Sequence, residues 1–210
     1  MQFKAIIFDR DGVIIDTEPI NLDSAIKAFS QQGIELTEKE KDLIIGTHPV
    51  DYQEYFKQKY PDFDFAQYRQ IKRELYLQGI ETAPLFNEII DLIKKLSQQN
   101  ITLGLVTSSA RPSTDKIIQR AGLQNVFQAI VSFEDCEQRK PAPDCYLKAA
   151  AKLNLEPKDC LVIEDTSIGL QAAKKAGMTC YVIPTKTTQD QDFSQADRIL
   201  QSGKELKNLI

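Results

Sequence analysis

Short apolar runs alternate along the chain with longer segments in which apolar residues recur every three or four positions. The short runs are residues 5–8 (AIIF), 101–107 (ITLGLVT), 129–132 (AIVS), 160–164 (CLVIE) and 179–183 (TCYVI). Helical spacing is found between them, in segments 87–99, 113–122, 144–154 and 168–177. This order predicts an α/β fold, a doubly wound parallel sheet of the Rossmann-like kind, since continuous apolar strands are typical of sheets buried on both faces.

One region departs from the alternation. Residues 17–82 contain no convincing strand, and their apolar residues follow helical spacing in four successive segments. The pair Ala83-Pro84 marks the return of the alternating pattern. We therefore expect a core of residues 1–16 and 83–210, with an all-helical domain of residues 17–82 inserted into it.

Composition and charge narrow the function classes. Hydrophobic residues make up 42% and charged residues 27% of the 210 residues, as in ordinary globular proteins. The net charge is −4 and no run of lysine or arginine is present, which argues against nucleic acid or an anionic membrane as a partner. No apolar stretch approaches the ~20 residues of a membrane span. A small molecule is the expected partner, and a monomer is expected with a dimer permitted.

The cysteine pattern and the N-terminal residues indicate the cellular compartment. The four cysteines are scattered and form no metal-binding pattern with the single histidine. Cys160 and Cys180 lie in apolar runs and read as small buried hydrophobes. The first apolar run of the chain is too short for a signal peptide, and the residues that follow it are too acidic. A reducing, cytoplasmic setting is expected.

Polar residues stand where the predicted strands end. They are Asp9 and Asp11 after the first strand, Thr107 and Ser108 after the second, Glu164 and Asp165 after the fourth, and Lys140 on the loop RKPAPD. The carboxyl ends of parallel strands share one edge of a sheet, so these groups are expected to meet. Crowded carboxylates repel one another unless a cation or a proton intervenes. Asp9, Asp11 and Asp165, with Glu164 close by, therefore predict a Mg²⁺ site.

Such a site suits phosphoryl transfer. A carboxylate such as Asp9 can attack phosphorus and form an aspartyl-phosphate. Lys140 and Thr107 would hold the phosphoryl oxygens, and Asp11 could give a proton to the leaving oxygen and later take one from water. Each residue alone also has a plain interpretation: paired aspartates favour turns, Lys140 could be solvated, and Thr107 could simply end a strand.

Four stretches together resemble a known family. FDRDG, VTSS, RKPAPD and VIEDTSIGLQAAKKAG are similar, in order and spacing, to the four motifs of the haloacid dehalogenase (HAD) superfamily, and the insert is placed as in its type I cap subgroup. The resemblance implies Asp9 as nucleophile and Asp11 as general acid/base whose backbone carbonyl also binds the metal. It implies Thr107 and Lys140 as phosphate binders, Asp165 as a magnesium ligand, and Glu164 in the inner or outer shell of the metal.

One residue departs from the family pattern. Arg10 stands where family members usually carry an apolar residue. Because side chains alternate along a strand, we expect Arg10 to point away from both carboxylates, either toward the substrate or cap or into a surface salt bridge.

The resemblance places substrate choice in the cap. The stretch IIGTHPVDY, with His48 after Gly46-Thr47, occupies the place of a specificity loop, and Lys72 that of a lysine reaching the substrate. On the core side, Ser108, Ser109 and Arg111 extend the phosphate loop, and Arg111 could meet a second anionic group. The plain alternatives are a surface or core role for His48 and a solvated helix face for Lys72.

Three functions are compatible with these residues. The leading one is a Mg²⁺-dependent phosphatase of a small phosphomonoester, of the sugar phosphate or phosphoglycolate type, working through an aspartyl-phosphate. A β-phosphoglucomutase-like mutase is the first alternative, weakened because Pro49 follows His48 where the mutase has a basic residue. A catalytically silent regulatory protein is the second, and the complete set of motif residues argues against it.

Overall fold

The computed structural model describes residues 3–45 and 47–209 and divides the chain into two compact units. The core unit joins the chain up to Asp16 to the chain from Pro84 onward, and the cap unit is Thr17–Ala83. The return to the core at Pro84 lies one residue after the position that the sequence predicts.

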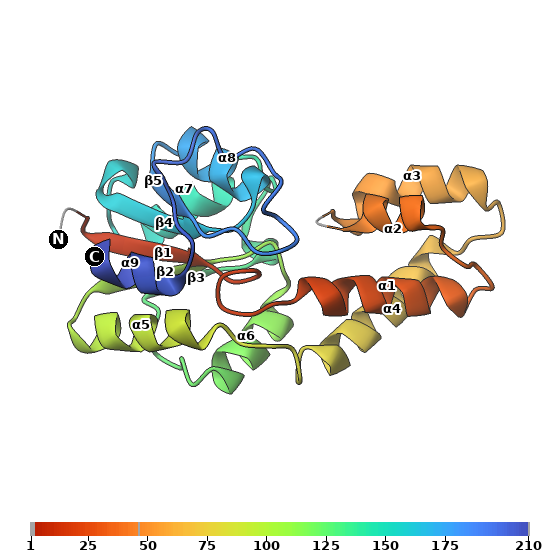
Figure 1. Cartoon of the computed structure of the whole chain (residues 1–210), viewed down its shortest axis with the longest axis horizontal. Coiled ribbons are helices and arrows are strands. Elements are labelled where there is room, and N and C mark those ends of the chain that lie inside the picture. Colours follow the sequence, from red (N-terminus) through yellow and green to blue (C-terminus); the bar gives the residue numbers. More distant parts are fainter. Residues whose placement is uncertain (1–2, 46, 210) are drawn as a thin grey trace. The chain divides into compact units, whose positions relative to one another are not determined.

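The core unit contains a parallel sheet with strand order β3-β2-β1-β4-β5-β6 (Figure 1). The strands are β1 (Ala5–Asp9), β2 (Thr102–Val106), β3 (Ala129–Val131), β4 (Cys160–Glu164), β5 (Thr179–Val182) and β6 (Arg198–Ile199). Every residue of β1 and β4 is buried, as continuous apolar runs predict for central strands. The predicted α/β fold with a parallel sheet is confirmed.

Helices cover both faces of this sheet. They are α5 (Asn87–Gln98), α6 (Arg111–Arg120), α7 (Asp144–Lys152), α8 (Ser167–Lys175) and α9 (Gly203–Leu209), with 3-10 turns at Phe133–Asp135 and Pro157–Asp159. Helices α7 and α8 pack on one face, where Tyr146 and Leu170 join a cluster with Ile7, Val106 and Val162. Helices α5 and α9 contact each other on the opposite side (Figure 1). The sheet is thus buried on both faces, and its strand ends remain available for polar residues.

The cap unit is built from α1 (Glu18–Ser30), α2 (Glu38–Ile44), α3 (Pro49–Lys59) and α4 (Phe65–Gly79). Its core is aromatic: Phe29 lies with its ring centroid 4.4 Å from that of Phe56, 4.9 Å from that of Phe63 and 4.5 Å from that of Tyr68. Rings of this size bury much apolar surface in a small helical unit, which therefore has its own core.

One element near the C-terminus, strand β6, was not anticipated. Strand β6 has only two residues, both exposed, so no apolar run marks it; it is held by pairing with β5.

Cys160 and Cys180 are buried, as expected. Cys136 and Cys145 form a disulfide, which the sequence did not indicate. Within the described part of the chain, no helix combines the length and the apolar character needed to span a membrane.

Candidate active site

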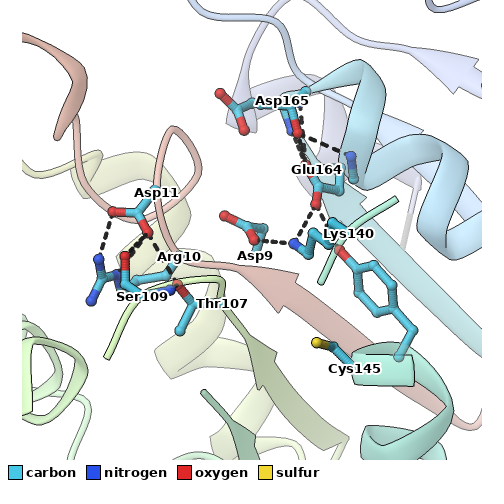
Figure 2. A network of polar contacts seen from close by, with 12 residues as sticks. Asp9, Arg10, Asp11, Thr107, Ser109, Lys140, Cys145, Glu164 and Asp165 are labelled. Carbon is cyan, nitrogen blue, oxygen red and sulfur yellow. Dashed lines mark hydrogen bonds and ion pairs between the residues drawn. The ribbon is translucent and has the colours of Figure 1, made fainter. Parts of the chain in front are cut away.

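Three neighbouring strands bring their last residues together at one edge of the core sheet (Figure 2). Asp9 ends β1 and pairs in register with Val106, the last residue of β2, which is followed by Thr107. Phe8 pairs with Ile163, so Glu164 at the end of β4 follows beside Asp9. The carboxyl edge of the sheet therefore collects groups from segments far apart in the sequence, as parallel strands require.

Lys140 forms ion pairs with two buried carboxylates. Its Nζ lies 2.5 Å from Asp9 Oδ1 and 2.7 Å from Glu164 Oε1. The side chains of Lys140, Asp9 and Glu164 expose only 4%, 8% and 1% of their surface. Burial alone would lower the pKa of Lys140, but the two carboxylates outweigh it and raise that pKa above its usual value. Lys140 is therefore a charged ammonium held against the Asp9 carboxylate.

Protein donors hold both oxygens of Glu164. Besides Lys140, the Tyr146 hydroxyl donates to Oε1 over 2.7 Å. The backbone N–H groups of Asp165 and Thr166 and the Thr166 hydroxyl donate to Oε2 over 3.0, 3.2 and 3.0 Å. Burial raises the pKa of Glu164, but the Lys140 charge and these hydrogen bonds more than offset it, so the pKa is lowered. This arrangement favours a role for Glu164 through Lys140 over direct contact with a metal.

Asp165 is a buried carboxylate, and one of its oxygens accepts no hydrogen bond from the described residues. It is 4% exposed, and its Oδ1 has no hydrogen-bond partner among the residues that the structure describes. Burial, with the nearby charges of Glu164 and Asp9, raises the pKa of Asp165 well above its usual value. A buried carboxylate oxygen without a donor is costly unless a cation or proton meets it. The Asp165 oxygen therefore fits a metal ligand.

The backbone makes room for Asp165 at Gly12. This glycine has φ of +78°, and a Cβ placed on it would overlap the Asp165 carboxylate. Across residues 3–45 and 47–209, no group of three His, Cys, Asp or Glu side chains is close enough to hold a metal ion. A metal site here would thus combine the Asp9 and Asp165 carboxylates with main-chain oxygen, consistent with the backbone role that the resemblance implies for Asp11.

The Asp11 side chain turns toward the end of β2. Its Oδ2 accepts hydrogen bonds of 3.1 Å from both the Thr107 and the Ser109 hydroxyls. Figure 2 shows this carboxylate directed at Thr107, Ser109 and Arg10, apart from the pair formed by Asp9 and Lys140. Asp11 is therefore next to the hydroxyl that we expect to bind a phosphoryl group.

The expectation for Arg10 is wrong. The side chain is fully buried and binds the neighbouring carboxylate: Nη2 lies 2.7 Å from Asp11 Oδ1, and Nε lies 3.1 Å from Asp11 Oδ2. Strand alternation ceases to apply at this point because β1 ends at Asp9. A guanidinium with no access to water needs a counterion, and Asp11 supplies it.

The remaining core residues take different positions. Thr107 is buried and accepts a hydrogen bond of 3.0 Å from the backbone of Ser109, while Ser108 is exposed. The Arg111 guanidinium lies 3.9 Å from Asp135, and its backbone N–H donates to the Glu134 carboxylate over 3.0 Å. Ser109 thus joins the site through Asp11, whereas Arg111 already faces acidic partners.

The predicted cap residues lie in the other unit. His48 is the N-cap of α3. Its ring Nδ1 accepts a hydrogen bond of 3.3 Å from the backbone N–H of Val50, and its backbone N–H donates to the Asp51 carboxylate over 3.1 Å. Lys72 on α4 is buried, and this burial lowers its pKa to about 8 although the Glu18 charge opposes the shift. Gly46, in the predicted specificity loop, is outside the described residues.

Three features around Lys140 were not predicted from the sequence. Tyr146 is fully buried, and its ring centroid lies 4.9 Å from Lys140 Nζ while its hydroxyl binds Glu164. The Cys136–Cys145 disulfide brackets the loop that carries Lys140. The Lys140-Pro141 peptide bond is cis. The motif RKPAPD marks the loop itself, but nothing in it indicates a tyrosine or a disulfide.

Comparisons with known proteins identify the family to which this chain is similar. A family model described as haloacid dehalogenase-like hydrolase matches residues 6–183. Hexitol phosphatase B of Escherichia coli is 30% identical, and the alignment covers 98% of this chain and 95% of that protein. The crystal structure of CbbY from Rhodobacter sphaeroides in complex with phosphate superposes with a TM-score of 0.86 at 27% identity, covering 97% of this chain and 96% of the other. A β-phosphoglucomutase from Clostridium difficile gives a TM-score of 0.80 at 25% identity, covering 97% and 93%.

Proposed function

Since this chain belongs to the haloacid dehalogenase-like hydrolase family, we propose that it is a magnesium-dependent phosphatase that hydrolyses a small phosphomonoester through an aspartyl-phosphate on Asp9. The substrate is of the sugar phosphate or phosphoglycolate type. The alternative of a catalytically silent regulatory protein is disfavoured, because every residue that the reaction needs is present.

One observation carries the proposal: a buried Asp9 carboxylate is paired with the Lys140 ammonium and lies in the electrostatic field of Asp165, which has an unpartnered oxygen. An ammonium and a carboxylate oxygen open to a cation are the groups needed to gather a phosphate dianion next to a nucleophile. A purely structural cluster would be expected to satisfy the Asp165 oxygen with a protein donor.

In the proposed reaction, each of these groups has one role. An Asp9 oxygen attacks phosphorus, the new P–O bond forms, and the bond from phosphorus to the leaving oxygen breaks. Asp11, which takes up a proton when the substrate binds, gives it to that leaving oxygen and afterwards takes a proton from the water that attacks the phosphorus of the aspartyl-phosphate. Inorganic phosphate leaves and Asp9 is restored. Lys140 and the Thr107 hydroxyl bind the phosphoryl oxygens throughout, where negative charge is concentrated.

Magnesium would be held by the Asp9 and Asp165 carboxylates and the main-chain carbonyl of Asp11. When bound, it supplies positive charge that offsets the repulsion between these acidic groups and the substrate phosphate. Glu164 contributes indirectly, because its carboxylate fixes the Lys140 ammonium.

The relatives support a phosphorylated sugar or polyol as substrate. One is named a hexitol phosphatase, and a mutant of CbbY from Rhodobacter sphaeroides, with a TM-score of 0.86 and 26% identity, was solved with xylulose-(1,5)bisphosphate. For this chain we propose that Lys72 contacts the substrate, since a buried ammonium gains from an anionic partner. His48, Ser108, Ser109 and Arg111 remain predicted substrate contacts.

A β-phosphoglucomutase-like activity is the second candidate, favoured by the similarity to the Clostridium difficile enzyme. The two candidates differ in the fate of the phosphoryl group, because a mutase returns it to sugar and a phosphatase passes it to water.

A panel of phosphorylated metabolites with Mg²⁺ tests the proposal. Phosphate release from hexitol, pentose or glycolate phosphates is expected, with activity lost in Asp9→Asn. A hexose 1-phosphate supplied with its bisphosphate should yield free phosphate faster than isomerised sugar phosphate. The opposite ratio would favour the mutase, and full activity of Asp9→Asn would refute the nucleophile assignment.

A further inference from the structure

Arg10 is the largest fully buried side chain of the described residues, and in the sequence it stands between the two proposed catalytic aspartates, Asp9 and Asp11. Its guanidinium contacts both oxygens of the Asp11 carboxylate, at 2.7 and 3.1 Å. Arg10 exposes 1% of its side chain, whereas Asp11 exposes 30%. A two-point contact of this kind fixes the plane of the carboxylate as well as its distance, which a single ammonium would not do.

The other end of the guanidinium is fixed by helix α6. Arg10 Nη1 donates to Ser113 Oγ over 3.0 Å and to Thr114 Oγ1 over 3.1 Å. Both hydroxyls donate their own protons to the carbonyl of Ala110, over 2.8 and 3.1 Å. Their lone pairs therefore face Arg10, and the guanidinium is held by the first turn of a helix that begins at Arg111.

Two hydroxyl groups also form hydrogen bonds with the Asp11 carboxylate. The Thr107 and Ser109 hydroxyls both donate to its Oδ2. Thr107 is also a proposed ligand of the phosphoryl group, so the oxygen that must meet the leaving group lies one hydrogen bond from the phosphate site. When Thr107 turns its proton to a phosphate oxygen, the contacts with Arg10 and Ser109 remain.

We propose that Arg10 is a positioning residue for Asp11: its buried guanidinium, anchored by Ser113 and Thr114, sets the orientation in which the Asp11 carboxylate meets the leaving oxygen and the attacking water. This deepens the proposed function and rests on it. The logic is that of an acid/base group oriented by a third side chain, and it assigns to this reaction a residue that does not itself touch the substrate.

The two half-reactions separate this role from a merely structural one. With p-nitrophenyl phosphate the leaving group departs without a proton, so attack by Asp9 does not require Asp11, whereas hydrolysis of the aspartyl-phosphate does. An alkyl phosphate needs Asp11 in both steps. Loss of orientation at Asp11 should therefore spare the first-turnover burst of p-nitrophenolate and slow the later turnovers.

The test compares Arg10→Met with the wild type by stopped-flow and steady-state kinetics. We expect the burst rate constant to change less than about threefold and kcat to fall at least about tenfold on both p-nitrophenyl and alkyl phosphates. With p-nitrophenyl phosphate, KM should fall together with kcat, so that kcat/KM, which reports binding and attack, stays within about threefold; with an alkyl phosphate, kcat/KM should fall as well. Arg10→Lys, which keeps the charge without the fork, should be intermediate. Arg69→Met, the same substitution at an exposed position of α4, is the matched control and should match the wild type.

A second variant covers the case in which Arg10→Met fails to fold. Ser113→Ala with Thr114→Val removes the anchors of the guanidinium without touching Asp11, and should show the same sparing of the burst with a smaller loss of kcat. A burst rate that falls together with kcat, or a kcat that does not change in either variant, would overturn the proposal.

The proposed function is tested separately by Asp11→Asn. That variant should itself keep the burst and lose steady-state turnover, and adding Arg10→Met to it should cause no further loss. If Asp11→Asn loses no turnover, the acid/base assignment fails and the role of Arg10 fails with it, whereas a loss of turnover in Asp11→Asn without one in Arg10→Met overturns the role of Arg10 alone. If Arg10→Met lowers kcat further in the Asp11→Asn background, Arg10 does not act through Asp11.

Discussion

Replacing Lys140 by methionine would show how strongly one ammonium stabilises the active-site edge of the sheet. Methionine keeps most of the length and apolar stem of the side chain and removes its charge. Asp9 and Glu164 would then face each other in a buried site without their shared counterion. Breaking a buried ion pair by removing one partner typically costs ~3–5 kcal/mol, because a buried charge is left uncompensated.

We therefore expect Lys140→Met to lower the free energy of unfolding of the core unit by about 3–5 kcal/mol, equivalent to roughly 6–20 °C in Tm for a chain of this size. Lys4→Met is the matched control. Lys4 pairs with Asp159 at 2.8 Å, a distance like that between Lys140 and Glu164, but 66% of the Lys4 side chain is exposed. Solvent screens an exposed pair of this kind, so it contributes little to stability.

Urea denaturation of the metal-free proteins at neutral pH measures both variants. Hydrogen exchange of the β1 and β4 amides assigns the loss to the core, since two compact units can unfold separately. If Lys140→Met costs no more than Lys4→Met, the Lys140 site is not the desolvated ion pair on which the mechanism depends.

Two further predictions address the cap unit and the metal site. Buried Glu40 has its pKa lowered to about 2, because hydrogen bonds from Lys59 and Thr37 outweigh the effect of burial. The Glu40 carboxylate therefore stabilises the cap unit at pH values above its unfolded pKa of about 4.5, and this contribution disappears as the pH falls toward 2. In urea titrations, Glu40→Gln should be less stable than the wild type at pH 7 and equally stable in acid. A difference in stability that does not depend on pH would contradict this. Gly12 and Gly33 have φ of +78° and +74°, but a Cβ would overlap the Asp165 carboxylate only at Gly12 and meets nothing within 4 Å at Gly33. Alanine should cost each site ~1–2 kcal/mol of backbone strain, and calorimetry should show weakened Mg²⁺ binding in Gly12→Ala alone; equal binding in both variants would argue against Asp165 as a ligand.

The sequence reveals features that depend on local pattern and strand order. The runs at 5–8 and 160–164 mark β1 and β4 because central parallel strands are buried on both faces. Strand order then brings Asp9 and Glu164 to one edge. The four helices of the cap unit could likewise be predicted from apolar spacing.

Features that depend on distant partners could not be found in this way. Arg10 is buried because Ser113 and Thr114, 103 and 104 residues further along the chain, offer it acceptors. Tyr146 reaches Glu164 across the interface between α7 and the sheet. Strand β6 has no apolar pattern and is recognisable only through its pairing with β5.

Direct detection of a phosphoryl group on Asp9 tests the central claim most directly. Asp11→Asn protein is mixed with Mg²⁺ and p-nitrophenyl phosphate, quenched in acid and digested for mass spectrometry. Attack proceeds but hydrolysis is slowed, so the peptide containing Asp9 should carry a phosphoryl group, which should be absent when Asp9 is also changed to asparagine. Release of p-nitrophenolate in the first turnover with no phosphorylated Asp9 peptide would contradict the proposed mechanism.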